Sequence, residues 1–378
     1  MLLCELRSFK GRTAIVGPSY RMLLILLVLL FNVSIGRADE TKYNALAFAT
    51  RDQYPQILAH RGASGYIPEH SLQAYETAMN LQTDYVEPDL CLTKDGVFVA
   101  LHDVLLDDTT NVAELPEFAS YKSTKVVDGV SLTGYFVSDF THAETQKLRL
   151  KQRLSFRTQI YNGFFTIPTL QQITALALDN FNSTQRLVGL YIELKHPSFF
   201  KSLGFDMASM LLRELSDAGY AVDLSAPSDL KRVLPLVIQC FDAPTLSALR
   251  PITSIPLVQL LDPPTPAQLH DGSYWSGQTL KEIATYANAI GPEKTYFSTL
   301  PLSDGQRAVQ SAQEAGLAMH PWTFRAEAQF VGKQFTSFAE EQAYFFFCLG
   351  VAGVFTEFPD QTRQVLQGAK VCPAPTQI

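Results

Sequence analysis

The sequence predicts an α/β fold, a (β/α)₈-type barrel, because short apolar segments alternate with longer helical patterns from residue 56 onward. Hydrophobic residues make up 47% of the 378 residues and charged residues 18%, which is typical of a globular protein rather than a disordered one. The alternation indicates a parallel sheet with helical crossovers. Nine candidate strands favour a barrel over an open sheet, and α/β barrels commonly reach this length as one domain.

Each expected strand is a short apolar segment, and most of them are followed by a helical pattern before the next strand begins. The expected strands span residues 57–60, 85–90, 97–102, 191–194, 237–241, 257–261, 287–292, 317–324 and 353–358. The expected helices span residues 70–80, 205–218, 243–249, 279–286, 303–315 and 338–349. No internal repeat interrupts this order.

Nine strands are one too many for an eight-stranded barrel, and the connection between the second and third explains the surplus. Only LCLTKDG (90–96) separates YVEPDL from VFVALH, whereas a parallel crossover needs a dozen or more residues. We therefore predict that these two strands form a hairpin. If Leu92 pairs with Val97 across the turn, Glu87 lies opposite His102.

Residues 104–167 interrupt the alternation, and this stretch is too long for an ordinary loop. We expect an inserted subdomain over the barrel mouth, after the third strand. A second irregular region, residues 262–278, has two interpretations of equal weight: it lines the same mouth, or it is a surface excursion.

The N-terminus carries the pattern of a signal peptide. Ten strongly apolar residues, 22–31, follow several basic residues and precede a small-residue segment that ends at Ala38. A membrane span needs about 20 such residues, so cleavage near Ala38 is favoured over an uncleaved anchor. We predict a signal peptide over residues 1–38 and an exported mature domain over 39–378, without a stable membrane span. Periplasm, medium and secretory lumen remain open as destinations.

The charge balance argues against a nucleic-acid partner. The whole chain has a formal charge of −7. Removing residues 1–38 takes away five basic residues and one acidic residue, which brings the charge to −11. A broad nucleic-acid footprint requires a basic surface, so any anionic substrate must be held by local positive charge.

The cysteines show no spacing typical of a metal finger or a redox motif. Cys240 is predicted to be buried in a strand and Cys348 in a helix. A disulfide between Cys348 and Cys372 is compatible with an exported protein, but the spacing alone does not establish it.

Three carboxylates form the candidate metal site. Glu87 and Asp89 lie two residues apart on one strand and therefore share a face, and Glu193 shares a face with Lys195 on another. Two carboxylates aimed inward repel each other unless a positive charge lies between them. Oxygen ligands suit a hard divalent cation, so Ca²⁺ is favoured here and Mg²⁺ is the alternative.

Two histidines are then free for proton transfer, His60 and His102. His60 is followed by Arg61 and Gly62, a turn that can present an imidazole and a guanidinium together. Arginine offers paired donors suited to a phosphate, and Lys195 adds a point charge from another strand. Taken alone, an HRG triplet is more often structural than catalytic.

The combination of motifs changes that balance. HRGASGYIPEHS, EPDL, TKDG, ALHD and IELK occur in one order on successive strands, and QCFD, VQLL, HPWTF and FTEFPD follow them. In this set the chain resembles the glycerophosphodiester phosphodiesterase family, particularly its exported bacterial-type members. The resemblance covers about residues 56–366.

The resemblance implies a distorted TIM barrel that hydrolyses glycerophosphodiesters, such as glycerophosphocholine, to sn-glycerol 3-phosphate and an alcohol. It implies that the insertion after ALHD helps to form the glycerol pocket. The implied roles are acid–base catalysis for His60 and His102, cation binding for Glu87, Asp89 and Glu193, and phosphate binding for Arg61 and Lys195.

Other residues have two interpretations each. Trp322 lines the substrate pocket or packs in the core, Glu69 stabilises a turn or reaches the cation, and His70 starts a helix rather than catalysing. Glu357 stands where relatives commonly have Asp, which leaves its role open.

Two other functions compete with this interpretation. A sphingomyelinase D-like phosphodiesterase would cleave membrane lipid with a similar site, but the long insertion and the full motif order favour a small diester. A surface binding protein on the same barrel would typically have lost a site residue, and none is missing.

Overall fold

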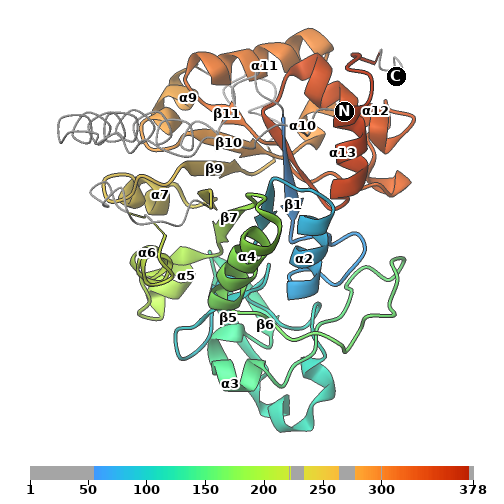
Figure 1. Ribbon diagram of the computed structural model, residues 1–378. Coiled ribbons are helices and arrows are strands. Elements are labelled where there is room, and N and C mark those ends of the chain that lie inside the picture. The colour runs from blue at the N-terminus through green and yellow to red at the C-terminus, as the bar shows by residue number, and fades with distance from the viewer. Residues whose placement is uncertain (1–54, 221, 223–233, 264–276, 299, 374–378) are drawn as a thin grey trace, which may run out of the picture. The chain divides into compact units, whose positions relative to one another are not determined.

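The computed structural model describes residues 55–220, 222, 234–263, 277–298 and 300–373. The predicted signal peptide, residues 1–38, and most of the irregular region 262–278 lie outside these ranges. Within them, eight parallel strands form a nearly closed barrel, as predicted (Figure 1). These strands are β1 (Gln56–His60), β2 (Tyr85–Glu87), β7 (Gly189–Leu194), β8 (Leu236–Cys240), β9 (Leu257–Leu261), β10 (Ala289–Pro292), β11 (Ala318–Met319) and β12 (Gly353–Thr356).

The barrel closes between β11 and β12, just beyond the end of β11. The backbone amide of Phe324 donates to the carbonyl of Phe355 at 2.8 Å, and the amide of Glu357 donates to the carbonyl of Phe324 at 3.1 Å. The last strand, β12, in turn pairs in parallel with the first, β1. Residues about 300 positions apart in the chain thus become neighbours.

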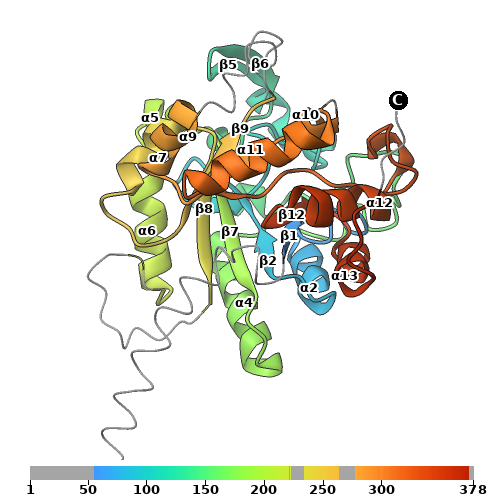
Figure 2. The ribbon, with the colours of Figure 1, turned by 90° about the horizontal axis from the view of Figure 1, so that it is seen from above.

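Helices cover the outside of the barrel, with α2, α4 and α13 beside β2, β7 and β1 (Figure 2). All predicted helices are confirmed to within two residues at each end, but α4, α5, α10 and α13 were not predicted. The helices of the barrel are α2 (Leu72–Asn80), α4 (Leu170–Thr184), α5 (Pro197–Ser202), α6 (Met207–Asp217), α7 (Ala243–Leu249), α9 (Gly277–Ala284), α10 (Thr295–Ser298), α11 (Leu302–Glu314), α12 (Phe338–Ala343), which continues as the π-helix η6 (Tyr344–Leu349), and α13 (Pro359–Gln367).

Local capping explains where two of these helices begin. The Ser71 hydroxyl accepts from the amide of Ala74 at the start of α2. Thr169 and Gln172 form a reciprocal capping box at the start of α4. Both helices therefore start directly after the segments that carry polar site residues or the insertion.

The predicted hairpin is confirmed, but its predicted register is wrong by one residue. Strand β3 (Asp89–Leu92) pairs antiparallel with β4 (Phe98–Ala100), and Leu92 lies opposite Phe98 rather than Val97. The turn accounts for the shift, because Thr93 and Val97 close a three-residue loop that ends at Gly96, whose φ is 77°.

The predicted pairing of Glu87 with His102 is consequently wrong. Glu87 ends β2, which pairs with β1 and β7 rather than with β4. Pro88, which has no N–H to donate, separates β2 from β3. Both side chains nevertheless border the cavity described below.

The insertion predicted at residues 104–167 lies between β4 and α4 (Figure 1). Its core includes Phe118 and Phe140, whose ring centroids are 5.0 Å apart, and it is continuous with the hydrophobic core of the barrel half formed by the earlier strands. Its elements are η1 (Val112–Glu114), η2 (Pro116–Tyr121), the hairpin β5 (Ser123–Val127) and β6 (Val130–Gly134), η3 (Val137–Asp139) and α3 (His142–Thr145).

A layer of apolar side chains fills the barrel interior, one from each of seven strands. The layer comprises Leu58, Tyr85, Tyr191, Val237, Val258, Ala289 and Phe355. Side chains two positions further along each strand also point into the barrel, and they lie one layer closer to its carboxyl end. The residues at those positions include His60, Glu87, Glu193, Gln239 and Glu357. The alternation of the strands thus places the polar layer directly on the apolar one.

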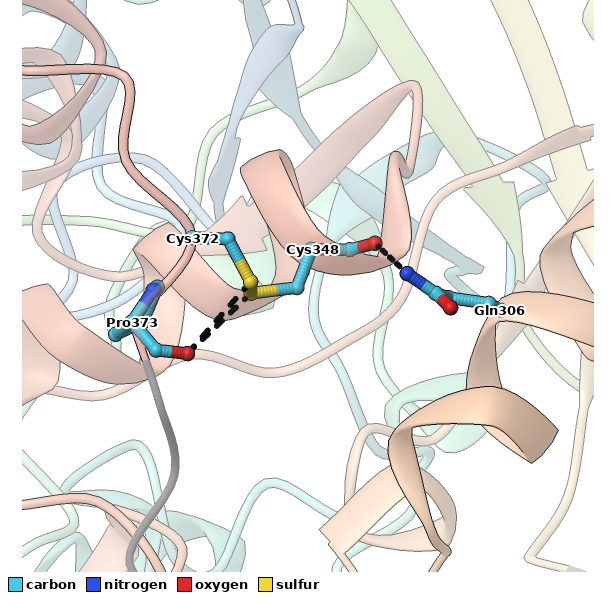
Figure 3. The surroundings of a disulfide bond; sticks show 4 residues. All are labelled: Gln306, Cys348, Cys372 and Pro373. Atoms are coloured by element: carbon cyan, nitrogen blue, oxygen red, sulfur yellow. Dashed lines mark hydrogen bonds between the residues drawn. A yellow bond between two sulfur atoms is a disulfide. The ribbon is translucent and has the colours of Figure 1, made fainter.

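A disulfide joins Cys348 of η6 to Cys372 near the C-terminus, with an S–S distance of 2.01 Å (Figure 3). The side-chain amide of Gln306 on α11 donates to the Cys348 carbonyl at 3.0 Å. The sequence left this pairing open, and the structure forms it. Cys240 is buried in its strand as predicted. A disulfide is consistent with an oxidising compartment outside the cytosol. In the ranges described, no helix is both long and apolar enough to cross a bilayer.

Candidate active site

A cavity of about 650 Å³ lies at the carboxyl end of the barrel strands. Seven of the eight predicted site residues border it: His60, Arg61, Glu87, His102, Glu193, Lys195 and Trp322. The eighth, Asp89, is fully buried on β3, where it pairs in register with Glu193 of β7. The structure therefore brings together the residues that the sequence placed on separate strands.

Glu87, Asp89 and Glu193 form a buried acidic cluster, in which one ligand oxygen from each lies within 4.8 Å of the others. Burial and the charges of its two neighbours raise the pKa of Glu87 well above its usual value. Burial also raises the pKa of Glu193 to about 8, with Asp89 adding to the effect and Lys195 opposing it. The Oδ1 atom of Asp89 is buried, and none of the residues that the structure describes donates a hydrogen bond to it.

This cluster fits a divalent cation. Buried carboxylates that repel one another are stabilised by a hard ion between them, and the free Asp89 oxygen supplies an unused ligand atom. Although burial alone would raise it, Lys195, His70 and Arg61 hold the pKa of Asp89 well below its usual range. Asp89 is therefore ionised and suited to bind a cation.

Arg61 and Lys195 stand beside the cluster and face the cavity. The Arg61 Nη1 atom lies 2.7 Å from Oε1 of Glu69, and its Nε atom lies 3.3 Å from Oδ2 of Asp89. The Lys195 Nζ atom lies 2.9 Å from Oε1 of Glu193. Two fixed cations beside the acidic cluster suit the binding of a phosphate group.

The turn after β1 has a left-handed backbone that brings Arg61 into the site. Arg61 has a φ of 59° and Gly62 a φ of 81°. A Cβ atom at Gly62 would lie 2.6 Å from the backbone of Ala74, so only glycine allows this close approach to α2. The Arg61 amide then donates to Oε2 of Glu87 at 2.9 Å.

The two histidines reach the cavity from different parts of the fold, His60 from the end of β1 and His102 from the loop after β4. The Nδ1 atom of His60 lies 3.1 Å from Oε1 of Glu357, and Nδ1 of His102 lies 2.9 Å from Oδ1 of Asp103. Burial, reinforced by Arg61, lowers the pKa of His60 to about 3. Burial, reinforced by Arg61 and Lys195, lowers that of His102 to about 4. Each ring is therefore neutral near pH 7.

Trp322 forms part of the cavity wall and also packs against the apolar layer inside the barrel. Its Nε1 atom donates to the Gly291 carbonyl at 2.7 Å, and its ring meets Phe241 edge to face at 5.9 Å. Its two predicted positions, in the pocket wall and against the core, are thus combined.

A family model described as the glycerophosphoryl diester phosphodiesterase family matches residues 60–361. The chain belongs to this family. A glycerophosphodiester phosphodiesterase of Arabidopsis thaliana, GDPD6, is 35% identical over 319 residues, which cover 80% of this chain and 84% of the relative. A glycerophosphodiester phosphodiesterase of Haemophilus influenzae is 29% identical, over 83% of this chain and 90% of the relative. A member of the glycerophosphodiester phosphodiesterase family is a phosphoric diester hydrolase, which confirms the predicted enzyme class.

Solved structures support the barrel. A crystal structure from Silicibacter pomeroyi matches 86% of this chain and 97% of its own, with a TM-score of 0.61 and 19% identity. A phosphodiesterase of Oleispira antarctica, solved in complex with the product sn-glycerol-3-phosphate, matches with a TM-score of 0.55 and 21% identity. At these identities the likeness establishes the fold of the glycerophosphodiester phosphodiesterase family.

Two residues that hydrogen-bond to the acidic cluster, His70 and Gln239, were not predicted as part of the site. His70, predicted as a helix-start residue, is buried and places Nε2 3.0 Å from Oδ2 of Asp89, while its Nδ1 lies 2.7 Å from the Tyr75 hydroxyl. The side-chain amide of Gln239 donates to Oε1 of Glu87 at 3.0 Å. Gln239 was detectable, because it lies two residues beyond an inward-facing valine on β8.

Glu69 lies outside the acidic cluster. Arg61 and Arg153 bind its two oxygens, each at 2.7 Å. Although burial opposes the effect, these two guanidinium groups lower the pKa of Glu69. The carboxylate therefore stabilises the turn that carries Arg61, which is the first of its two predicted roles.

Proposed function

We propose that the chain hydrolyses glycerophosphodiesters such as glycerophosphocholine and glycerophosphoethanolamine, releasing sn-glycerol 3-phosphate and an alcohol. The observation that carries this proposal is that two histidines, two fixed cations and a buried acidic cluster lie around one cavity. The names of the relatives support the substrate class, and the product bound to the Oleispira antarctica phosphodiesterase supports the product.

Glu87, Asp89 and Glu193 would hold one divalent cation, with Ca²⁺ favoured and Mg²⁺ the alternative. When bound, such an ion neutralises charge on the phosphoryl oxygens and polarises the phosphorus centre. Arg61 and Lys195 orient the same phosphate from the side, because both face the cavity next to the cluster.

His60 and His102 transfer the protons of the reaction. One imidazole, in its neutral form, takes a proton from the attacking hydroxyl group, either of water or of the substrate's own glycerol, while the other, charged as an imidazolium beside the bound anionic diester, gives a proton to the leaving alkoxide. The P–O bond to the alcohol breaks as the new P–O bond forms. Where the substrate's own hydroxyl attacks, this step gives a cyclic phosphate, which water then opens to glycerol 3-phosphate. Trp322 contributes an apolar wall beside the substrate.

An assay of purified protein tests this proposal. Release of glycerol 3-phosphate from glycerophosphocholine and glycerophosphoethanolamine should occur with Ca²⁺ or Mg²⁺, stop with a chelator and return on adding metal. Sphingomyelin and intact phosphatidylcholine serve as the comparison, because preferential cleavage of these lipids would instead identify a sphingomyelinase D-like enzyme. If no diester is turned over in a chelator-sensitive way, the proposed hydrolysis is refuted and a binding function remains.

We also propose that the protein is exported and that residues 1–38 are a cleaved signal peptide. The Cys348–Cys372 disulfide supports export, because such bonds persist in oxidising compartments. N-terminal sequencing of the protein from its native source should start close to residue 39. A mature chain that still begins at Met1 would refute cleavage.

A further inference from the structure

Glu357 is a buried carboxylate that the mechanism above does not use. It follows β12 and is 1% exposed. Its Oε1 atom accepts from Arg325 Nε at 2.8 Å and lies 3.1 Å from His60 Nδ1, while its Oε2 atom lies 2.6 Å from Arg157 Nη2. Three groups from distant parts of the chain thus converge on one side chain.

We propose that Glu357 is a positioning residue for the hydrolysis, which holds the His60 ring in one orientation and one tautomer. This inference rests on the proposed role of His60 in proton transfer. An ionised carboxylate only accepts hydrogen bonds, so the Nδ1 atom facing it must carry the proton. The Nε2 atom of His60 is then left with its lone pair for the cavity.

The charge of Glu357 is secured by its two arginines. Burial alone would favour the neutral acid, but His60, Arg325 and Arg157 hold the pKa of Glu357 well below its usual range. A protonated carboxyl group would be free to donate to Nδ1 and select the opposite tautomer. The two guanidinium groups therefore help to determine which nitrogen of His60 carries the proton.

Arg157 connects this arrangement to the insertion. Its Nη1 atom donates to the Ser64 carbonyl at 3.0 Å, and its Nε atom donates to Glu327 at 2.6 Å. The Ser64 hydroxyl in turn donates to the His60 carbonyl at 2.7 Å. The insertion thus supports both the side chain and the backbone of His60, in addition to lining the cavity with Asp108 and Arg153.

Steady-state kinetics of three variants, at saturating metal, test the proposal. Glu357→Gln keeps the size of the side chain but removes the charge, and its kcat should fall about 10- to 100-fold while KM changes little. Glu357→Asp keeps the charge with a shorter reach and should recover part of the loss. Glu327→Gln is the matched control, because it removes the other carboxylate partner of Arg157 and should keep nearly full turnover.

Nitrogen NMR of histidine-labelled full-length protein gives a readout that a purely structural role would not change. The His60 signals, assigned by their loss in His60→Ala, should show the Nδ1–H tautomer in the wild type and a mixture or the opposite tautomer in Glu357→Gln. The proposal is overturned if Glu357→Gln keeps the wild-type tautomer and kcat, or if its lost activity matches its lost folded fraction. Full turnover by His60→Ala would instead refute the proposed function.

Discussion

The two histidines of the site occupy opposite environments. His60 is 10% exposed and contacts a carboxylate that is 1% exposed and lies 297 residues away in the chain. His102 is 33% exposed and contacts Asp103, the adjacent residue, which is 53% exposed. One ring is fixed by the closed barrel and the other by its own loop. The difference teaches that two rings with similarly lowered pKa values can be held by a buried partner from the far end of the chain in one case and by an exposed neighbour in the other.

Removing either imidazole should have the largest effect on kcat. Unequal losses of kcat in the two variants would show that the two histidines do not contribute equally to turnover. We expect His60→Ala and His102→Ala each to lower kcat by about 100- to 10,000-fold, because each removes a proton-transfer group. Circular dichroism should show wild-type folding. A near-normal rate in one variant would mean that only the other histidine transfers a proton.

Removing a charge from the proposed metal site should have the next largest effect. Asp89→Asn keeps the shape of the side chain but removes one charge from the acidic cluster. We expect Ca²⁺ and Mg²⁺ to bind more weakly by about 10-fold or more, with activity partly restored by excess metal. Calorimetric titration measures the affinity directly, and Glu69→Gln, outside the cluster, should bind metal normally.

Replacing the carboxylate beside each histidine, Glu357 for His60 and Asp103 for His102, tests whether the buried partner contributes more to turnover than the exposed one. Asp103→Asn should lower kcat less than Glu357→Gln does, by about twofold to fivefold, since an exposed hydrogen bond competes with water. The ratio of the two kcat losses is the quantity to measure. Equal losses would show that exposure does not decide how much each partner contributes.

The smallest effect on turnover should come from the disulfide. Replacing both Cys348 and Cys372 by Ser opens a link between residues 24 positions apart, which should lower the free energy of unfolding by about 3 kcal/mol. Neither cysteine borders the cavity, so kcat at 25 °C should stay near the wild-type value. A large change in kcat would indicate a connection from the C-terminal segment to the site.

Much of the barrel and of the site follows from local patterns in the sequence. The alternation of apolar segments predicts the strands, and the period of two places Glu87 and Asp89 on one face. Helix α4 was missed, because its buried positions include small or polar residues such as Thr174 and Ala177 and give a weak apolar pattern.

The remaining features depend on contacts that no local pattern contains. The hairpin register changed because the loop closed at Thr93 and Val97 rather than one residue earlier. His70 appeared to be an ordinary helix-start residue until folding brought Asp89 beside it. Arg157 lies in the insertion, 200 residues from the carboxylate it binds, so neither spacing nor periodicity connects the two.

Closure of the barrel has a consequence for how the enzyme becomes active. His60 comes from the first strand and Glu357 follows the last, so their contact exists only once β12 has docked against β1. A growing chain therefore lacks a complete site until almost all of it has been synthesised and folded. If Glu357 positions His60, the return of full turnover during refolding reports the arrival of the last strand, even when the first half of the barrel has long been formed.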